Sequence, residues 1–236
     1  DWDVNRGGAL NEQGEFAKAV PGGADINLAG TYNVVYNANS EVIYVLRWGV
    51  VGSIASIPGF SWNADVPMTL GTDGKWYSSP IALTVDDRFK IREYAQWDNN
   101  RGGVCAAVGE PFEASAGGSD IAVPADGTYM VVYDAANESI ELTTDFWGLI
   151  GNFNSWGGDV FMTCLGNGVW AAYNQTLGAG WKIRQAAGWD VNRGGVFGES
   201  GVPFAVTNGG ADIDAGEGAL DIVYDSSAET ITATVR

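Results

Sequence analysis

A seven-residue segment, Trp-Asp-x-Asn-Arg-Gly-Gly, occurs three times in the chain and constrains its fold more than any other feature. The three copies begin at Trp2, Trp97 and Trp189, so their starts are 95 and 92 residues apart. A period of this length is that of a whole domain, because solenoid repeats are only about 20 to 50 residues long. We therefore expect a series of similar domains.

We call this seven-residue segment the box. Other segments recur in the same order around it. A Gly-Gly-(Ala/Ser)-Asp-Ile turn follows each copy, and a Trp-Gly-x-x-Gly segment and a Lys-Ile-Arg triplet precede the last two copies. We predict complete domains over residues 48–143 and 144–236, joined by a short linker near residues 143–145. Residues 1–47 then form the C-terminal half of a preceding repeat. That half lacks the strands that should pair with it, so either an upstream half or another chain completes it.

Apolar residues within each repeat alternate with polar ones or run for four to eight positions, and Gly, Pro, Asn and Asp interrupt them. This is the pattern of β-strands. Phe89 and Ile91, for example, alternate with Lys90 and Arg92. Core positions are also expected at Tyr129, Val131, Tyr133, Ile231, Ala233 and Val235. About seven short strands in a repeat of this length predict an all-β chain of tandem immunoglobulin-like β-sandwich domains.

Composition excludes several classes of function. The formal net charge is −17, and a chain this acidic repels nucleic acids and anionic lipid head groups. The chain has no histidine, so it offers no histidine nucleophile system, general base or zinc ligand. No apolar run is long enough for a membrane span. Cys105 and Cys164 have apolar neighbours, which favours two unlinked core thiols over a single bridge.

Basic residues are concentrated in the repeated box. The chain has twelve lysines and arginines, and seven of them lie in Lys-Ile-Arg or in Trp-Asp-x-Asn-Arg-Gly-Gly. Strand alternation places Lys90 with Arg92, and Lys182 with Arg184, on the face opposite the core. A face of hydrogen-bond donors beside a tryptophan suits a polysaccharide, which has hydroxyl groups and apolar ring faces. The alternative is that these cations pair with nearby carboxylates and that the tryptophans are core residues.

Calcium binding and catalysis are both less favoured. Asp-x-Asn-x-Gly-Gly resembles the start of a calcium loop, but Gly109 and Gly201 stand where the bidentate Glu is required, so we do not expect calcium as a partner. Four carboxylates are candidates for glycoside hydrolysis, and no pair of them stands out in both repeats. They are Asp65, Asp86, Glu93 and Asp159. We therefore expect neither an enzyme nor a cofactor.

The ordered motifs together resemble the repeated carbohydrate-binding domains of the SusE/SusF family. These proteins are surface glycan-binding lipoproteins of Bacteroidetes starch-utilisation systems, and their domains are similar to the X25-type modules of bacterial pullulanases. The resemblance covers nearly the whole chain. It implies a non-catalytic protein that binds starch or a related α-glucan on the outside of the outer membrane, anchored by a lipid outside this chain, with an outer-membrane glycan-uptake complex as a partner.

The resemblance also implies a set of binding residues. Trp62 and Trp156 correspond to the family's aromatic platform and Lys90 and Lys182 to its donors. Further candidates lie in the Lys-Ile-Arg triplets and in the Trp-Asp-x-Asn-Arg-Gly-Gly segments. These are Arg92, Trp97, Asn100, Arg184, Trp189 and Asn192. The loop before Trp62 is longer than the loop before Trp156, so the two sites are expected to differ in shape, or one of them to be inactive. The alternative function is a structural repeat of a surface layer or filament, assembled by strand addition.

Overall fold

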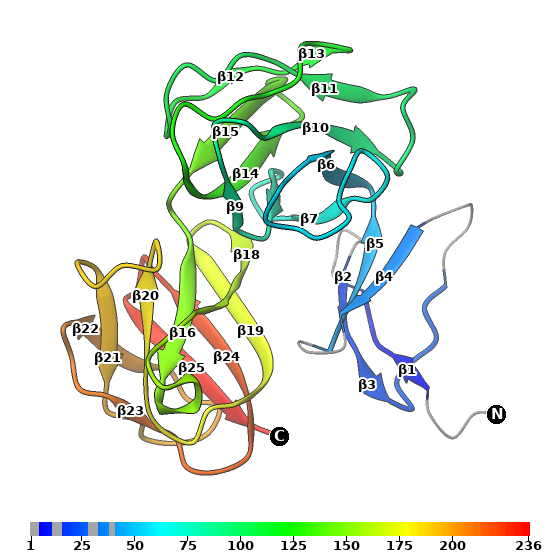
Figure 1. Ribbon diagram of the computed structural model, residues 1–236. Coiled ribbons are helices and arrows are strands. Elements are labelled where there is room, and N and C mark those ends of the chain that lie inside the picture. The colour runs from blue at the N-terminus through cyan, green and yellow to red at the C-terminus, as the bar shows by residue number, and fades with distance from the viewer. Residues whose placement is uncertain (1–4, 11–15, 28–32, 38–40) are drawn as a thin grey trace. The chain divides into compact units, whose positions relative to one another are not determined.

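The protein is described by a computed structural model, in which residues 5–10, 16–27, 33–37 and 41–236 are placed (Figure 1). These residues form an all-β structure, as the alternation of apolar residues predicted. Their helical content is one short 3-10 turn, η1 (Asn152–Asn154), so the described part has no helix that could cross a membrane. The chain divides into two compact units, Asp1–Thr143 and Thr144–Arg236.

The first unit begins with what we call the leading segment, residues 5–47. Its described strands form a two-stranded sheet, β1 with β3, and a three-stranded sheet in the order β2-β5-β4. The strands are β1 (Arg6–Gly7), β2 (Phe16–Lys18), β3 (Val20–Pro21), β4 (Asn33–Asn37) and β5 (Val42–Leu46). A small cluster of Ala17, Ala19 and Ile43 is the buried core of this segment.

The rest of the first unit is a ten-stranded antiparallel system in the order β12-β15-β14-β8-β7-β6-β10-β11-β13, with β9 beside β14. Its strands are β6 (Trp48–Ser53), β7 (Val66–Leu70), β8 (Trp76–Ser78), β9 (Ile81–Leu83), β10 (Arg88–Glu93), β11 (Asn100–Gly102), β12 (Phe112–Glu113), β13 (Ser115–Ala116), β14 (Gly127–Asp134) and β15 (Ser139–Thr143). Its core includes Phe89, Ile91, Tyr133 and Leu142.

The second unit is a ten-stranded system in the order β17-β16-β20-β21-β22-β25-β24-β19-β18, with β23 beside β20. Its strands are β16 (Trp147–Gly151), β17 (Val160–Phe161), β18 (Thr163–Gly166), β19 (Val169–Thr176), β20 (Ala179–Gln185), β21 (Asn192–Gly195), β22 (Phe204–Asn208), β23 (Ile213–Asp214), β24 (Ala219–Asp225) and β25 (Thr230–Val235). These strand systems are consistent with β-sandwiches. The immunoglobulin-like arrangement and the assignment of residues 1–47 to a preceding repeat remain predictions.

The repeated sequence gives the same packing in both units. Trp48 packs edge-on against Tyr133, and Trp147 packs against Tyr224 with the same centroid distance of 4.7 Å and angle of 61°. Of the expected core positions, Val235 is the exception, because it lies at the end of β25 and its side chain is exposed. Cys105 and Cys164 are both free thiols.

Candidate functional site

Each unit carries a pair of tryptophans on two neighbouring loops. In the first unit, Trp62 follows β6 and Trp97 lies in the β10–β11 hairpin, and their ring centroids are 5.9 Å apart at an angle of 39°. In the second unit, Trp156 and Trp189 are 5.8 Å apart at 38°. β6 ends beside the start of β10, where Ser53 pairs with Arg88, and β16 ends beside β20 in the same way. The loop that follows then runs back toward the hairpin, because Asp65 binds Arg92 near the end of β10 and Asp159 binds Arg184 near the end of β20. We call each couple a tryptophan pair.

The two members of a pair differ in exposure. Trp97 is 46% exposed and Trp189 is 48% exposed, whereas Trp62 and Trp156 are half-buried. A large aromatic side chain normally lies inside a protein. An exposed one that packs against a neighbouring ring indicates a surface for binding. Trp97 and Trp189 therefore present the larger apolar surfaces, with Trp62 and Trp156 beside them.

The backbone at the first tryptophan of each pair is strained. Trp62 and Trp156 have φ angles of 58° and 59°, in the left-handed region that bulky residues seldom adopt. The N–H of Trp62 donates to the carbonyl of Gly52, and the N–H of Trp156 donates to that of Gly151, each at 2.8 Å. Strain of this kind costs about 1–3 kcal/mol and persists where the surroundings impose it. Because Trp62 and Trp156 have the same backbone conformation, their rings leave the backbone in the same way in both units.

The loop before each first tryptophan is anchored differently in the two units. In the first unit, the Asp87 carboxylate accepts hydrogen bonds from the backbone N–H of Ala55 at 2.8 Å and of Thr84 at 2.7 Å. Burial raises the pKa of Asp87, but these bonds and that of the Thr84 hydroxyl group outweigh burial, so the pKa lies below its usual value. In the second unit, Asn152 accepts from Trp156 Nε1 at 2.8 Å and donates to the carbonyl of Ala179. The loop before Trp62 is longer than the loop before Trp156, but the ring distance and the angle within the tryptophan pair are nearly the same in both units.

The second tryptophan of each pair is placed by a tight hairpin. Tyr94 and Ala95 both have positive φ angles, and the N–H of Gln96 donates to the carbonyl of Glu93 at 2.9 Å. Asn100 Nδ2 donates to the carbonyl of Trp97 at 2.8 Å, and Asn192 does the same for Trp189 at 3.0 Å. The two asparagines thus hold the loop that carries the tryptophan, using side-chain N–H groups that the sequence suggested for ligand binding.

The arginines of Lys-Ile-Arg lie beneath the exposed tryptophans. Arg92 forms two hydrogen bonds with the carboxylate of Asp65, at 2.8 and 2.7 Å, and its guanidinium group lies 4.8 Å from the centroid of Trp97. Arg184 pairs with Asp159 and lies 4.7 Å from Trp189. Both arginines are buried. They are on the predicted side of the strand, but their position is that of a support for the tryptophan.

The lysines of the same triplet bind the Gly-Gly turn. Lys90 donates to the carbonyl of Gly118 and its Nζ lies 3.8 Å from a carboxylate oxygen of Asp120. Lys182 donates to the carbonyl of Gly210 and lies 3.6 Å from Asp212. Each ammonium group is largely covered and already has acceptors. Lys90 also donates to Asn100 Oδ1 at 3.3 Å, so its ammonium group faces three acceptors, whereas Lys182 faces two.

The carboxylates near the site are engaged by cations. Asp65 and Asp159 bind the buried arginines, and Glu93 accepts from Arg47 Nε at 3.0 Å and from Asn99 at 2.6 Å. Within the described residues, no three Cys, Asp or Glu side chains gather closely enough to hold a metal ion. What each site offers is a rigid, tilted pair of aromatic faces, supported from below by an arginine and a carboxylate.

Sequence reasoning missed two parts of this arrangement. The partner of each arginine is the aspartate three residues after the first tryptophan, at Asp65 and Asp159, a spacing that both repeats share. The left-handed conformation of Trp62 and Trp156 has no local sequence signal, because glycine is the residue that ordinarily marks it.

Comparisons with known proteins do not assign this chain to a family. No protein-family model matches it, and no curated protein matches it. Among solved structures it is similar to "Crystal Structure of SusF from Bacteroides thetaiotaomicron", at 14% sequence identity and a TM-score of 0.31. The match covers 94% of this chain and 56% of that one, so the chain spans about half the length of that protein. A TM-score this low supports no conclusion about function.

Proposed function

We propose that the chain is a non-catalytic carbohydrate-binding protein and that each tryptophan pair stacks against the sugar rings of a glucan. The observation that carries the proposal is the exposure of Trp97 and Trp189, which are held at the same angle to a second tryptophan in both units. A pyranose has an apolar C–H face that covers an indole well, and its hydroxyl groups remain available to water and to nearby polar side chains.

The tilt within each pair bears on which glucan would fit. Two platforms at 38–39° to each other are not coplanar, so two sugar rings that lie flat on them are also turned relative to one another. An α-linked glucan curves along its length and turns its rings in this way, whereas a flat β-1,4-linked chain favours coplanar platforms. The geometry therefore favours starch or a related α-glucan.

The support beneath each tryptophan makes the platform rigid before the ligand arrives. Because Arg92 and Arg184 are enclosed by an aspartate and an indole, they position the ring and do not donate to the sugar. A preorganised site loses less conformational entropy on binding. Lys90 and Lys182 stay candidates for a hydrogen bond to a sugar hydroxyl: Lys182 through the donor that its two acceptors leave over, and Lys90 by exchanging its 3.3 Å bond to Asn100 for one to the sugar.

The cellular setting in this proposal is the outer face of the outer membrane. It rests on the resemblance of the repeated motifs to the SusE/SusF family, which also suggests a lipid anchor outside this chain and a glycan-uptake complex as partner.

Isothermal titration of the intact chain with maltoheptaose tests the proposal. We expect binding with a Kd on the order of 0.1–1 mM per site, and loss of detectable heat in the Trp97→Ala/Trp189→Ala variant. A Val104→Ala/Val196→Ala variant is the matched control, since these valines are 75% and 79% exposed and lie outside the pairs. Binding that survives removal of both exposed tryptophans would contradict the proposed site.

A further inference from the structure

The leading segment reproduces the second half of a complete domain. Strand β1 pairs with β3 in the register in which β11 pairs with β13 and β21 pairs with β22. The N–H of Gly8 donates to the carbonyl of Ala24 at 2.9 Å, and in the first complete domain Gly103 donates to Ser119 at the same distance. Gly22 and Gly117 share a φ of 63°. The backbone frame of half a domain is therefore already formed.

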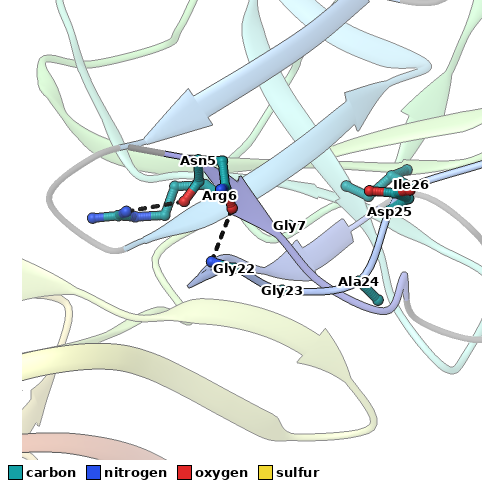
Figure 2. A pocket seen from close by; sticks show the side chains of 8 residues that line it. All are labelled: Asn5, Arg6, Gly7, Gly22, Gly23, Ala24, Asp25 and Ile26. Atoms are coloured by element: carbon teal, nitrogen blue, oxygen red, sulfur yellow. Dashed lines mark hydrogen bonds between the residues drawn. The ribbon is translucent and has the colours of Figure 1, made fainter. Parts of the chain in front are cut away.

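A hollow of about 560 Å³ lies within this frame (Figure 2). Its lining includes Asn5, Arg6, Gly7, Gly23, Asp25 and Ile26. In the two complete domains, the corresponding place is filled by the Lys-Ile-Arg strand. There Ile91 pairs with Arg101, and Ile183 pairs with Arg193, both of which occupy the position of Arg6.

The lysine of that strand has a matching acceptor in the hollow. Lys90 and Lys182 each bind the carbonyl of the second glycine of the turn and lie near the aspartate two residues later. In the leading segment these two positions are Gly23 and Asp25. Asp25 is exposed, and none of the ion pairs among the described residues involves it. The hollow thus keeps the acceptors of a lysine.

Apolar side chains of the leading segment are uncovered on β4. Val34 is 57% exposed and Tyr36 is 43% exposed. Their counterparts in the complete domains are no more than 1% exposed, namely Val131, Tyr133, Ile222 and Tyr224. There a tryptophan of the Trp-Gly-x-x-Gly strand packs on the tyrosine, as Trp48 does on Tyr133. Tyr36 is the equivalent tyrosine in the leading segment, so such a tryptophan would pack against it.

We propose that the leading segment is a preformed acceptor for the first half of another repeat. An aromatic-Lys-Ile-Arg strand enters between β1 and Ile26, so that its aromatic residue lies opposite Ile26, its lysine reaches Gly23 and Asp25, and its isoleucine pairs with Arg6. The register is that of the Trp181–Ile213 and Ile183–Arg193 pairs. The accompanying Trp-Gly-x-x-Gly strand places its tryptophan on Tyr36.

The occupant is a polypeptide of this type from outside residues 1–236. Both Lys-Ile-Arg strands of the chain are already paired within their own domains, β10 with β11 and β20 with β21. A folded second copy therefore offers no unpaired strand of this kind. Main-chain pairing along the strand supplies affinity, and the lysine and the aromatic side chains supply specificity.

A probe for the occupant is a fluorescein-labelled fragment of residues 144–187, which contains one first half-repeat. Fluorescence anisotropy with the intact chain should show saturable binding. Asp25→Lys should weaken it at least tenfold, because two like charges then meet, and Lys182→Glu in the fragment should restore it. Asp120→Lys is the matched control, since the equivalent position in the complete domain is already occupied by Lys90. An equal effect of Asp25→Lys and Asp120→Lys would overturn the proposed site.

A covalent version keeps the test decisive if the separate fragment binds too weakly to detect. Residues 144–187 joined directly in front of Asp1 preserve the spacing between Lys-Ile-Arg and the box. Amide hydrogen exchange in β4 should then slow by more than tenfold relative to the chain alone, with β14 as the internal reference. Exchange in β4 that the fusion leaves unchanged would overturn the proposal.

Discussion

Replacing Arg184 by methionine should destabilise the second unit strongly. The carboxylate of its partner, Asp159, has a side-chain exposure of 0%, and Arg184 binds it through hydrogen bonds of 2.6 to 3.0 Å. Removal of the cation leaves a buried carboxylate without a partner, which costs about 3–5 kcal/mol. Loss of the contact with Trp189 adds about 0.5–1 kcal/mol.

Amide hydrogen exchange in β20 measures this cost within one unit, and β10 in the first unit is the internal control. The two costs together are about 3.5–6 kcal/mol, so the expected loss of protection is roughly three-hundredfold to about twenty-thousandfold, at tenfold per 1.4 kcal/mol. Asp159→Asn in the same chain should recover much of it, because the neutral amide removes the buried charge at almost unchanged volume. An unchanged volume is needed because Asp159 is tightly packed: a methyl group on the Cα of Gly148 would lie only 2.8 Å from Asp159 Cβ.

The reasoning fails if Arg184→Met changes protection in β20 by less than about fivefold, or about 1 kcal/mol. The pair would then behave as a solvent-screened surface contact, and Trp189 would have no buried support. It also fails if the Arg184→Met/Asp159→Asn variant is as unstable as Arg184→Met, because the cost would then come from lost packing of the arginine stem.

Three further outcomes follow from the structure. Trp62→Gly and Trp62→Ala should both weaken maltoheptaose binding, but thermal unfolding should show the glycine variant to be more stable by about 1 kcal/mol, since only glycine relieves the left-handed strain; equal stabilities would contradict that strain. Trp156→Ala should reduce affinity for polymeric starch by about a hundredfold and affinity for a short oligosaccharide far less, because two tethered sites act together; equal losses in isothermal titration would mean that the sites act independently. Asp87 has a lowered folded-state pKa, so its contribution is fully present above the unfolded pKa of about 3.9 and is lost as pH falls through the folded value; Asp87→Asn should flatten the stability of the first unit in urea titrations below about pH 4 and lower it by about 1–3 kcal/mol at pH 7, and an unchanged acid dependence would argue against that role.

Much of the fold could be predicted because strand alternation and the repeat are local signals. Phe89 and Ile91 face the core, and Lys90 and Arg92 lie on the other side, as a period of two requires. Val235 departs from its pattern because alternation fixes a face of the strand but not whether anything covers it.

The site was harder to predict because partners come from distant parts of the chain. The sequence identified the tryptophans, arginines and asparagines of the repeated motifs as candidate site residues. It could not distinguish a side chain that donates to a ligand from one that holds another side chain in place. Arg92 became buried because Asp65, 27 residues earlier, meets it across the strands, and Asn100 is used by the carbonyl of Trp97. The loop before Trp62 is longer than its counterpart, yet both end in the same hydrogen bond to a glycine carbonyl. Tertiary contacts of this kind leave no periodic pattern in the sequence.

Affinity electrophoresis of the intact chain in gels that contain soluble polysaccharides tests the central claim most directly. The panel should include amylopectin and pullulan as α-glucans and a soluble cellulose derivative and xylan as β-linked chains. We predict that the α-glucans retard the chain, that the β-linked polymers do not, and that Trp97→Ala/Trp189→Ala migrates as it does in a gel without polysaccharide. Equal migration of the intact chain in every gel would contradict the account.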